Sequence, residues 1–108
     1  MASSIDFVQY AAEQMSNAGK ITYRRMFGEY GMYCGGIFFA VICDDQLFIK
    51  ITEAGEKRFP SLRKAPAYDG AKNSFLIEDI DNRQMLTELV TVTCLALSEK
   101  PKRKEKLK

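Results

Sequence analysis

The fold is decided by residues 21–51, which read ITYRRMFGEYGMYCGGIFFAVICDDQLFIKI. The stretch is rich in β-branched and aromatic residues and is broken by turn-forming residues, a pattern typical of successive short strands. Gly35-Gly36 suits a two-residue hairpin, because both glycines accept positive φ, and residues 44–46 indicate a second turn. Links this short predict an antiparallel meander. The expected strands are 21–27, 30–34, 37–43 and 47–51.

The residues before the meander predict a helix over 4–18. Apolar side chains recur there at the spacing of one helix face. Ser3, with Asp6 three positions later, matches a capping box in its acidic form and favours a helix start. Gly19 is a typical helix stop, because glycine adopts the left-handed terminal conformation at low cost.

The residues after the meander predict a short helix, a loop, a strand and a long helix. The short helix opens at Thr52-Glu53 and ends near Arg58 or Phe59. Residues 60–73 hold two prolines and a glycine, so we expect a loop there. A last strand is expected over 74–78. The final helix is expected to be capped by Asp79 or Asp81, to end at Pro101 and to bury Met85, Leu86, Leu89, Val90 and Leu97.

The predicted element order is α-β-β-β-β-α-β-α, which indicates an α+β fold. We expect two layers, with an antiparallel sheet of about five strands and the helices on one face. The 108 residues fit one domain, which we expect over residues 1–98. Residues 99–108 hold six basic and two acidic residues, in a chain whose net charge is +2, and they predict a basic flexible tail.

The composition argues against common catalytic sites. The chain has no histidine, the commonest acid–base catalyst and metal ligand, and it has neither a P-loop nor a dinucleotide fingerprint. Cys34, Cys43 and Cys94 are odd in number and far apart, which predicts reduced, mostly buried thiols. We therefore expect no enzyme activity, no cofactor and no metal site. An enzyme using carboxylates or a thiol would need a pocket in which titratable groups converge.

The sequence also predicts a cytoplasmic protein without a membrane segment. The longest apolar run, 37–43, is far shorter than the roughly 20 residues of a spanning helix. The N-terminus lacks the basic and apolar regions of a signal peptide, and Asp6 interrupts it early. The expected reduced thiols agree with this location.

The most unusual segment is 24–33, RRMFGEYGMY, in which paired arginines precede glycines and aromatic residues. Adjacent side chains on a strand point to opposite faces, so one of Arg24 and Arg25 should face the helices and need a partner, for which Glu29 and Glu13 are conceivable. A structural ion pair and a recognition role both remain open. The candidate interaction residues are Arg24, Arg25, Phe27, Gly28, Tyr30, Lys50, Lys102, Arg103 and Lys104.

Three blocks, 24–33, FFAVI at 38–42 and DQLFIK at 45–50, are followed by a strand FLIE at 75–78 and an amphipathic helix. This pattern resembles the N-terminal domain of the TfoX/Sxy family of competence regulators. The resemblance implies a two-layer α+β domain like that of secretion chaperones, and it carries over no catalytic residue. Full-length members regulate competence genes with the cyclic-AMP receptor protein and carry a C-terminal helical domain. This chain ends at Lys108, so a single-domain member is expected.

Two functions are compatible with these observations. The first is a non-catalytic protein-interaction or adaptor domain related to competence and transcription regulators. Its partner would be the transcription machinery or the cyclic-AMP receptor protein. The alternative is a nucleic-acid-binding module that uses the basic tail with Arg24, Arg25 and Lys50, and its affinity would fall steeply with salt. A homodimer is a further expectation, by analogy of fold.

Overall fold

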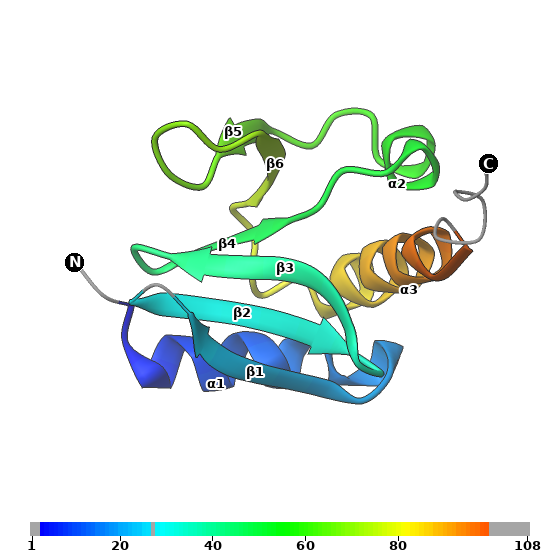
Figure 1. Ribbon diagram of the computed structural model, residues 1–108. Helices are drawn as coiled ribbons and strands as arrows, with labels where there is room; N and C mark the ends of the chain where they lie inside the picture. Colours follow the sequence, from blue (N-terminus) through cyan, green and yellow to red (C-terminus); the bar gives the residue numbers. More distant parts are fainter. Residues whose placement is uncertain (1–2, 27, 100–108) are drawn as a thin grey trace, which may run out of the picture.

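Figure 1 shows the computed structural model of the chain, which describes residues 3–26 and 28–99. Within these residues a six-stranded antiparallel sheet has the strand order β1-β2-β3-β4-β6-β5. The elements are α1 (Ile5–Gln14), the 3₁₀ helix η1 (Ser16–Ala18), β1 (Ile21–Met26), β2 (Glu29–Cys34), β3 (Ile37–Cys43), β4 (Gln46–Ile49), α2 (Glu53–Arg58), β5 (Lys64–Pro66), β6 (Asn73–Ile77) and α3 (Arg83–Glu99). The α+β class is confirmed, with one strand more than expected.

Two tight hairpins build the middle of the sheet. Gly35 and Gly36 connect β2 to β3 with φ of 58° and 86°, and Asp44 and Asp45 connect β3 to β4 with φ of 55° and 56°. Positive φ at both central positions is the signature of a turn whose twist matches that of paired strands. Both predicted turns are therefore confirmed. The apolar strand β3 lies between β2 and β4, as its composition indicated.

The hydrophobic core lies between the sheet and the helices α1 and α3. Strand side chains alternate between the two faces, and several of those facing the helices are less than 2% exposed, among them Met32, Ile42, Leu47, Ile49 and Phe75. They pack in one cluster with Val8 of α1 and with Leu86, Leu89 and Val90 of α3. Burial of each such side chain contributes about 1.5–3 kcal/mol. Figure 1 shows α1 beneath β1 and β2, and in the described residues no helix covers the other face of these strands.

The cap of α1 differs from the prediction by one residue. Ser4, and not Ser3, caps the helix, because its Oγ accepts the N–H of Phe7 at 3.1 Å. Ser3 is engaged elsewhere, since its Oγ accepts the N–H of Asp45 at 2.9 Å. A cap requires only a side-chain acceptor near the first free N–H groups, so neighbouring serines are equivalent until tertiary contacts choose between them.

The end of α1 also differs from the predicted helix over 4–18. The α-helix ends at Gln14, and η1 continues the chain as a tighter turn before Gly19. The Ser16 hydroxyl donates to the carbonyl oxygen of Glu13 at 2.7 Å. Side-chain bonds of this kind compete with helical backbone bonds, which explains the early end.

Part of the predicted loop 60–73 forms the additional strand β5. The N–H of Leu76 on β6 donates to the carbonyl of Arg63 at 2.8 Å, at the start of this pairing. β5 is an edge strand, where Pro66 is tolerated because no further strand requires its missing N–H. A strand of three residues that includes a proline has no recognisable alternation, so the sequence pattern did not reveal it.

The short helix α2 lies where the sequence predicts it. Thr52 caps it by accepting the N–H of Gly55 at 3.0 Å. The last strand is also present, as β6, with a shift of one residue at each end. On β4, Leu47 and Ile49 face the core, while Phe48 lies on the opposite face and pairs across the sheet with Leu76.

The cap of α3 corrects a further prediction. Asn82 replaces Asp79 and Asp81 as the cap, because its Oδ1 accepts the N–H of Met85 at 3.1 Å. The predicted buried stripe is confirmed, with Leu86, Leu89 and Val90 fully buried and Met85 and Leu97 partly so. The predicted stop at Pro101 lies outside the described residues. No helix in the described ranges has both the length and the apolar character needed to cross a membrane.

Candidate functional site

The two adjacent arginines of β1 lie on opposite faces of the sheet, each against a tyrosine of β2. The guanidinium carbon of Arg24 is 5.8 Å from the ring centre of Tyr33, and that of Arg25 is 5.7 Å from the ring centre of Tyr30. A cation at this distance from an aromatic ring is attracted by about 0.5–1 kcal/mol at an exposed site. The opposite orientations predicted from strand geometry are confirmed, and the rings hold both exposed charges in place.

The predicted ion pair of an arginine with Glu29 or Glu13 is wrong. No salt bridge between described residues involves Arg24 or Arg25. The physical reason is that the ring contacts take up the guanidinium groups while backbone groups take up the carboxylate of Glu29. Both arginine charges are consequently left without a neutralising carboxylate in the described part of the chain.

The carboxylate of Glu29 binds two backbone N–H groups from distant segments. Its Oε1 accepts the N–H of Ser3 at 2.9 Å, and its Oε2 accepts the N–H of Asp44 at 3.0 Å. Burial alone would raise the pKa of Glu29, but the hydrogen bonds from Asp44 and Ser3 stabilise the charged form and hold its pKa below the ordinary value of 4.5. Glu29 therefore has a structural role at neutral pH.

A second cation, Lys50, contacts an aromatic ring on the same face as Arg24, which no described helix covers (Figure 1). The Nζ of Lys50 is 4.4 Å from the ring centre of Phe38, and the rings of Phe38 and Tyr33 are 5.4 Å apart. Both rings are partly exposed. We refer to Arg24, Tyr33, Phe38 and Lys50 as the cation–aromatic surface. It combines positive charge with aromatic faces, which suits the binding of carboxylates or of stacked planar groups.

Gly31 lies beneath this surface and gives its neighbours room. A Cβ at Gly31 would come within 2.9 Å of the Sδ of Met26 and 3.0 Å of the Cε1 of Phe38. Real Cβ atoms avoid such distances, so only glycine lets both side chains lie across the strand. Gly31 in the segment 24–33 is therefore required by the packing of its neighbours.

The other predicted interaction residues are placed as follows. Gly28 is exposed in the β1–β2 turn with φ of 81°. Tyr30 is only 7% exposed and belongs to the core, so its contribution is to pack its ring against Arg25. Phe27, Lys102, Arg103 and Lys104 lie outside the described residues.

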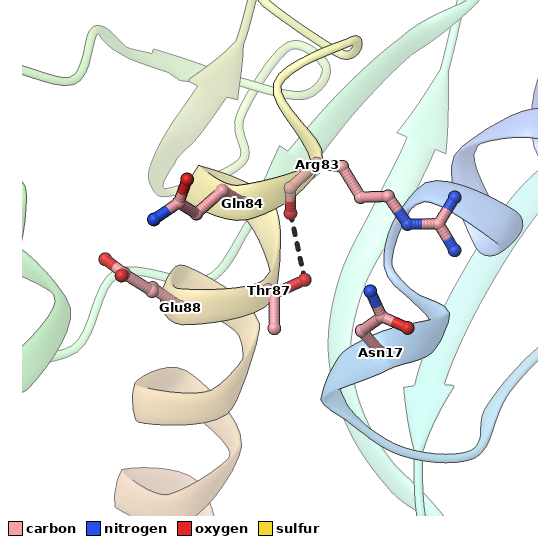
Figure 2. A pocket seen from close by; sticks show the side chains of 5 residues that line it. All are labelled: Asn17, Arg83, Gln84, Thr87 and Glu88. Carbon is pink, nitrogen blue, oxygen red and sulfur yellow. Dashed lines mark hydrogen bonds between the residues drawn. The ribbon is translucent and has the colours of Figure 1, made fainter.

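A groove of about 470 Å³ lies between η1 and the first turns of α3 (Figure 2). Its lining is Asn17, Arg83, Gln84, Thr87 and Glu88. Figure 2 shows Arg83 reaching toward η1, where it donates to the Oγ of Ser16 at 3.1 Å and to the Oε1 of Gln14 at 3.4 Å. Glu88 points to the other side of α3 and pairs with Arg58 at 2.9 Å. The charged side chains that line the groove, Arg83 and Glu88, point in different directions. The groove is therefore the junction between η1 and α3.

The three cysteines are free thiols, of which Cys34 and Cys94 are buried and Cys43 is half-buried. Burial, followed by the neighbouring Cys34, raises the pKa of the Cys94 thiol to about 12. Burial and the nearby carboxylates also raise the pKa of the half-buried Cys43. A thiol with a raised pKa is a poor nucleophile at neutral pH. In residues 3–26 and 28–99, no three Cys, Asp or Glu side chains gather as ligands of a metal ion would.

The cation–aromatic surface lies inside a segment that matches a known family model. The model is that of the TfoX N-terminal domain, and it matches residues 13–91. The chain belongs to the TfoX N-terminal domain family. This confirms the resemblance, and the family is linked to competence regulation.

A curated relative is the uncharacterised 12.7 kDa protein in the trpE 5′ region of Spirochaeta aurantia. It is 28% identical over 109 residues, which cover 100% of this chain and 95% of the relative. The similarity therefore extends over nearly the whole of both sequences.

Sequence reasoning missed two polar residues that shape this TfoX N-terminal domain. Asn82 was recognisable, because asparagine is a preferred N-cap and an apolar helical pattern follows it. Glu29 has no local signal, because its partners Ser3 and Asp44 are 26 and 15 residues away along the chain.

Proposed function

We propose that this TfoX N-terminal domain is a non-catalytic protein-interaction domain that serves transcription regulation in the cytoplasm. The observation that carries the proposal is that Arg24 and Arg25 are exposed and that, among residues 3–26 and 28–99, tyrosine rings are the only recorded partners of their guanidinium groups. By contrast, Arg58 and Arg63 each pair with a glutamate at 2.9 Å. Guanidinium groups held on rigid strands without a carboxylate are well suited to charge-assisted hydrogen bonds with a partner.

The partner that we propose first is the cyclic-AMP receptor protein, because the TfoX N-terminal domain family is linked to competence regulation. The test is a binding titration of the purified full chain against the purified receptor and, separately, against RNA polymerase. The double variant Arg24→Gln/Arg25→Gln should weaken binding about tenfold, the equivalent of about 1.4 kcal/mol. Lys57→Gln is the matched control, because it removes an exposed positive charge from α2, outside β1.

Two results would contradict this function. One is the absence of binding to either protein at micromolar concentrations, which correspond to about 8 kcal/mol of binding free energy. The other is equal weakening by Lys57→Gln and by the double arginine variant, since a loss that follows net charge alone indicates attraction without a defined site.

A second candidate function is the binding of single-stranded nucleic acid. It is favoured by the position of Arg24 and Lys50 on either side of the Tyr33 and Phe38 rings, because bases stack on aromatic rings while cations bind phosphates. The test is fluorescence anisotropy with a labelled oligonucleotide. Affinity should fall by about 10³-fold or more between low and moderate salt if several phosphates are bound. A full-length variant with Lys102, Arg103 and Lys104 changed to Gln isolates the contribution of the tail.

A further inference from the structure

Strand β1 is an edge of the sheet, and one side of its backbone has no partner among the described residues. It pairs with β2 alone. The N–H of Gly35 donates to the carbonyl of Lys20 at 2.9 Å, and hydrogen-bonded pairs alternate along an antiparallel ladder. Thr22 and Arg24 therefore direct their backbone groups toward β2. The residues whose backbone groups face away from the sheet are Ile21, Tyr23 and Arg25.

A groove of about 320 Å³ lies against this edge. Its lining is Thr22, Tyr23, Arg24, Tyr33 and Gly36, which come from β1, β2 and the β2–β3 turn. In peptide recognition by strand addition, main-chain hydrogen bonds supply affinity and pockets for alternate side chains supply specificity. The edge of β1 offers both features.

The charge of the edge indicates the chemistry of the ligand. Arg24 and Arg25 are exposed on opposite faces. Successive side chains of an added strand also point to opposite faces. Two adjacent acidic residues in that strand would therefore place one carboxylate beside each guanidinium, and each contact would be a charge-assisted hydrogen bond.

We propose that the free edge of β1 binds an extended acidic segment of a partner protein by strand addition. Ile21, Tyr23 and Arg25 form the new ladder, and Arg24 and Arg25 each bind one carboxylate. This rests on the proposed function as a protein-interaction domain, and it adds the site and the chemistry of the partner. A second copy of β1 is a poor occupant, because pairing two such edges would bring arginines near arginines, and like charges on an edge oppose association.

The test uses the full chain and a capped probe peptide, Thr-Val-Glu-Glu-Val-Thr, with the same peptide carrying Gln-Gln as control. Amide hydrogen exchange by NMR should slow at least about tenfold for Ile21, Tyr23 and Arg25 when peptide is added, because their N–H groups gain acceptors. Thr22 and Arg24 should not change, since they already bond to β2. This alternation separates strand addition from general electrostatic contact.

Substitutions test the charge contacts. Arg24→Gln and Arg25→Gln should each weaken peptide binding about fivefold, and the Gln-Gln peptide should bind more weakly by a similar or larger factor. Lys57→Gln should leave the affinity unchanged. All three variants change exposed side chains, so each should fold.

Four results would overturn the proposal. The first is that the peptide slows exchange at none of the outward-facing amides, and the second is that both peptides bind with equal affinity. The third is that a single-stranded oligonucleotide displaces the peptide at moderate salt. The fourth is protection of β1 that rises with protein concentration in the absence of peptide, which would identify a second copy as the occupant. If the receptor or the polymerase binds but the Glu-Glu peptide neither binds nor competes, the edge is not the site and the proposed function stands. If the peptide binds with the expected protection and neither protein binds, the edge is supported and the choice of partner is wrong.

Discussion

The carboxylate of Glu29 accepts the backbone N–H of Asp44 at 3.0 Å, and this bond ties the start of β2 to the β3–β4 turn. The same carboxylate holds Ser3, whose hydroxyl accepts the N–H of Asp45. Asp44 and Asp45 both have positive φ, which costs a non-glycine residue about 1 kcal/mol. The hydrogen bonds to this turn offset that cost, so one glutamate connects the N-terminus, β2 and a strained turn.

Glu29→Gln should destabilise the fold by about 1 kcal/mol. The amide keeps one acceptor oxygen but cannot accept both N–H bonds, and charge-assisted bonds are the stronger kind. Urea unfolding of the variant and the wild type measures the difference. Glu13→Gln, an exposed glutamate of α1, is the control and should change stability by less than about 0.5 kcal/mol. Equal effects of the two substitutions would contradict the structural role of Glu29.

The stabilisation by Glu29 should depend on pH. Its pKa is lower in the folded chain than the ordinary value of 4.5, so the unfolded chain takes up the proton first as the pH falls. The contribution is therefore complete above the unfolded pKa and is lost as the pH falls through the folded pKa. The difference in unfolding free energy between wild type and Glu29→Gln should shrink from neutral pH to about pH 3. A constant difference over this range would show that ionisation of Glu29 is not the cause.

Gly31→Ala should destabilise the domain by about 1–3 kcal/mol through overpacking. The new Cβ meets Met26 and Phe38 at 2.9 and 3.0 Å, and neither contact is relieved without movement of a side chain. Thermal unfolding measures the loss. When Met26 is already replaced by Ala, the nearer contact is absent. The substitution Gly31→Ala should therefore lower the stability less in the Met26→Ala variant than in the wild type. Additive losses would exclude steric conflict with Met26.

Thr93→Val should stabilise the protein by about 1 kcal/mol. The Oγ1 of Thr93 is buried and has no hydrogen-bond partner among the described residues, and an unsatisfied buried hydroxyl is costly. Valine has the same shape without the polar atom. Thr91→Val is the matched control, because the exposed Thr91 already donates to the carbonyl of Thr87 at 2.7 Å. A destabilised Thr93→Val variant would indicate a partner for that hydroxyl.

The thiol of Cys43 should react before those of Cys34 and Cys94 with a charged disulfide reagent at mildly alkaline pH. Cys34 and Cys94 are buried, whereas Cys43 is half-buried, and the pKa of Cys94 is raised to about 12. All three should react at similar rates once the chain is unfolded. Cys43→Ser should remove the first phase of the reaction. Early modification of Cys94, identified by mass spectrometry, would contradict this order.

Periodicity and turn chemistry predicted most of the fold, because these signals are local. The hairpin at Gly35-Gly36, the strand Ile37–Cys43 and the cap at Thr52 all depend on residues close in the chain. The strand β5, which the sequence did not predict, is too short to show an alternation of apolar and polar residues. Its pairing with β6 is a tertiary contact. The caps of α1 and α3 were misplaced by one to three residues, because several side-chain acceptors lie next to one another there and only packing selects one.

The candidate site was predicted in part. The sequence by itself determined that Arg24 and Arg25 point to opposite faces, because side chains alternate along every strand. It also determined the α+β class, since the order of strands and helices follows from hydrophobic period and turn residues. Only the tertiary structure decided that tyrosines hold the two arginines and that Glu29 bonds to Ser3 and Asp44, because these contacts join residues that come together only when the strands pair.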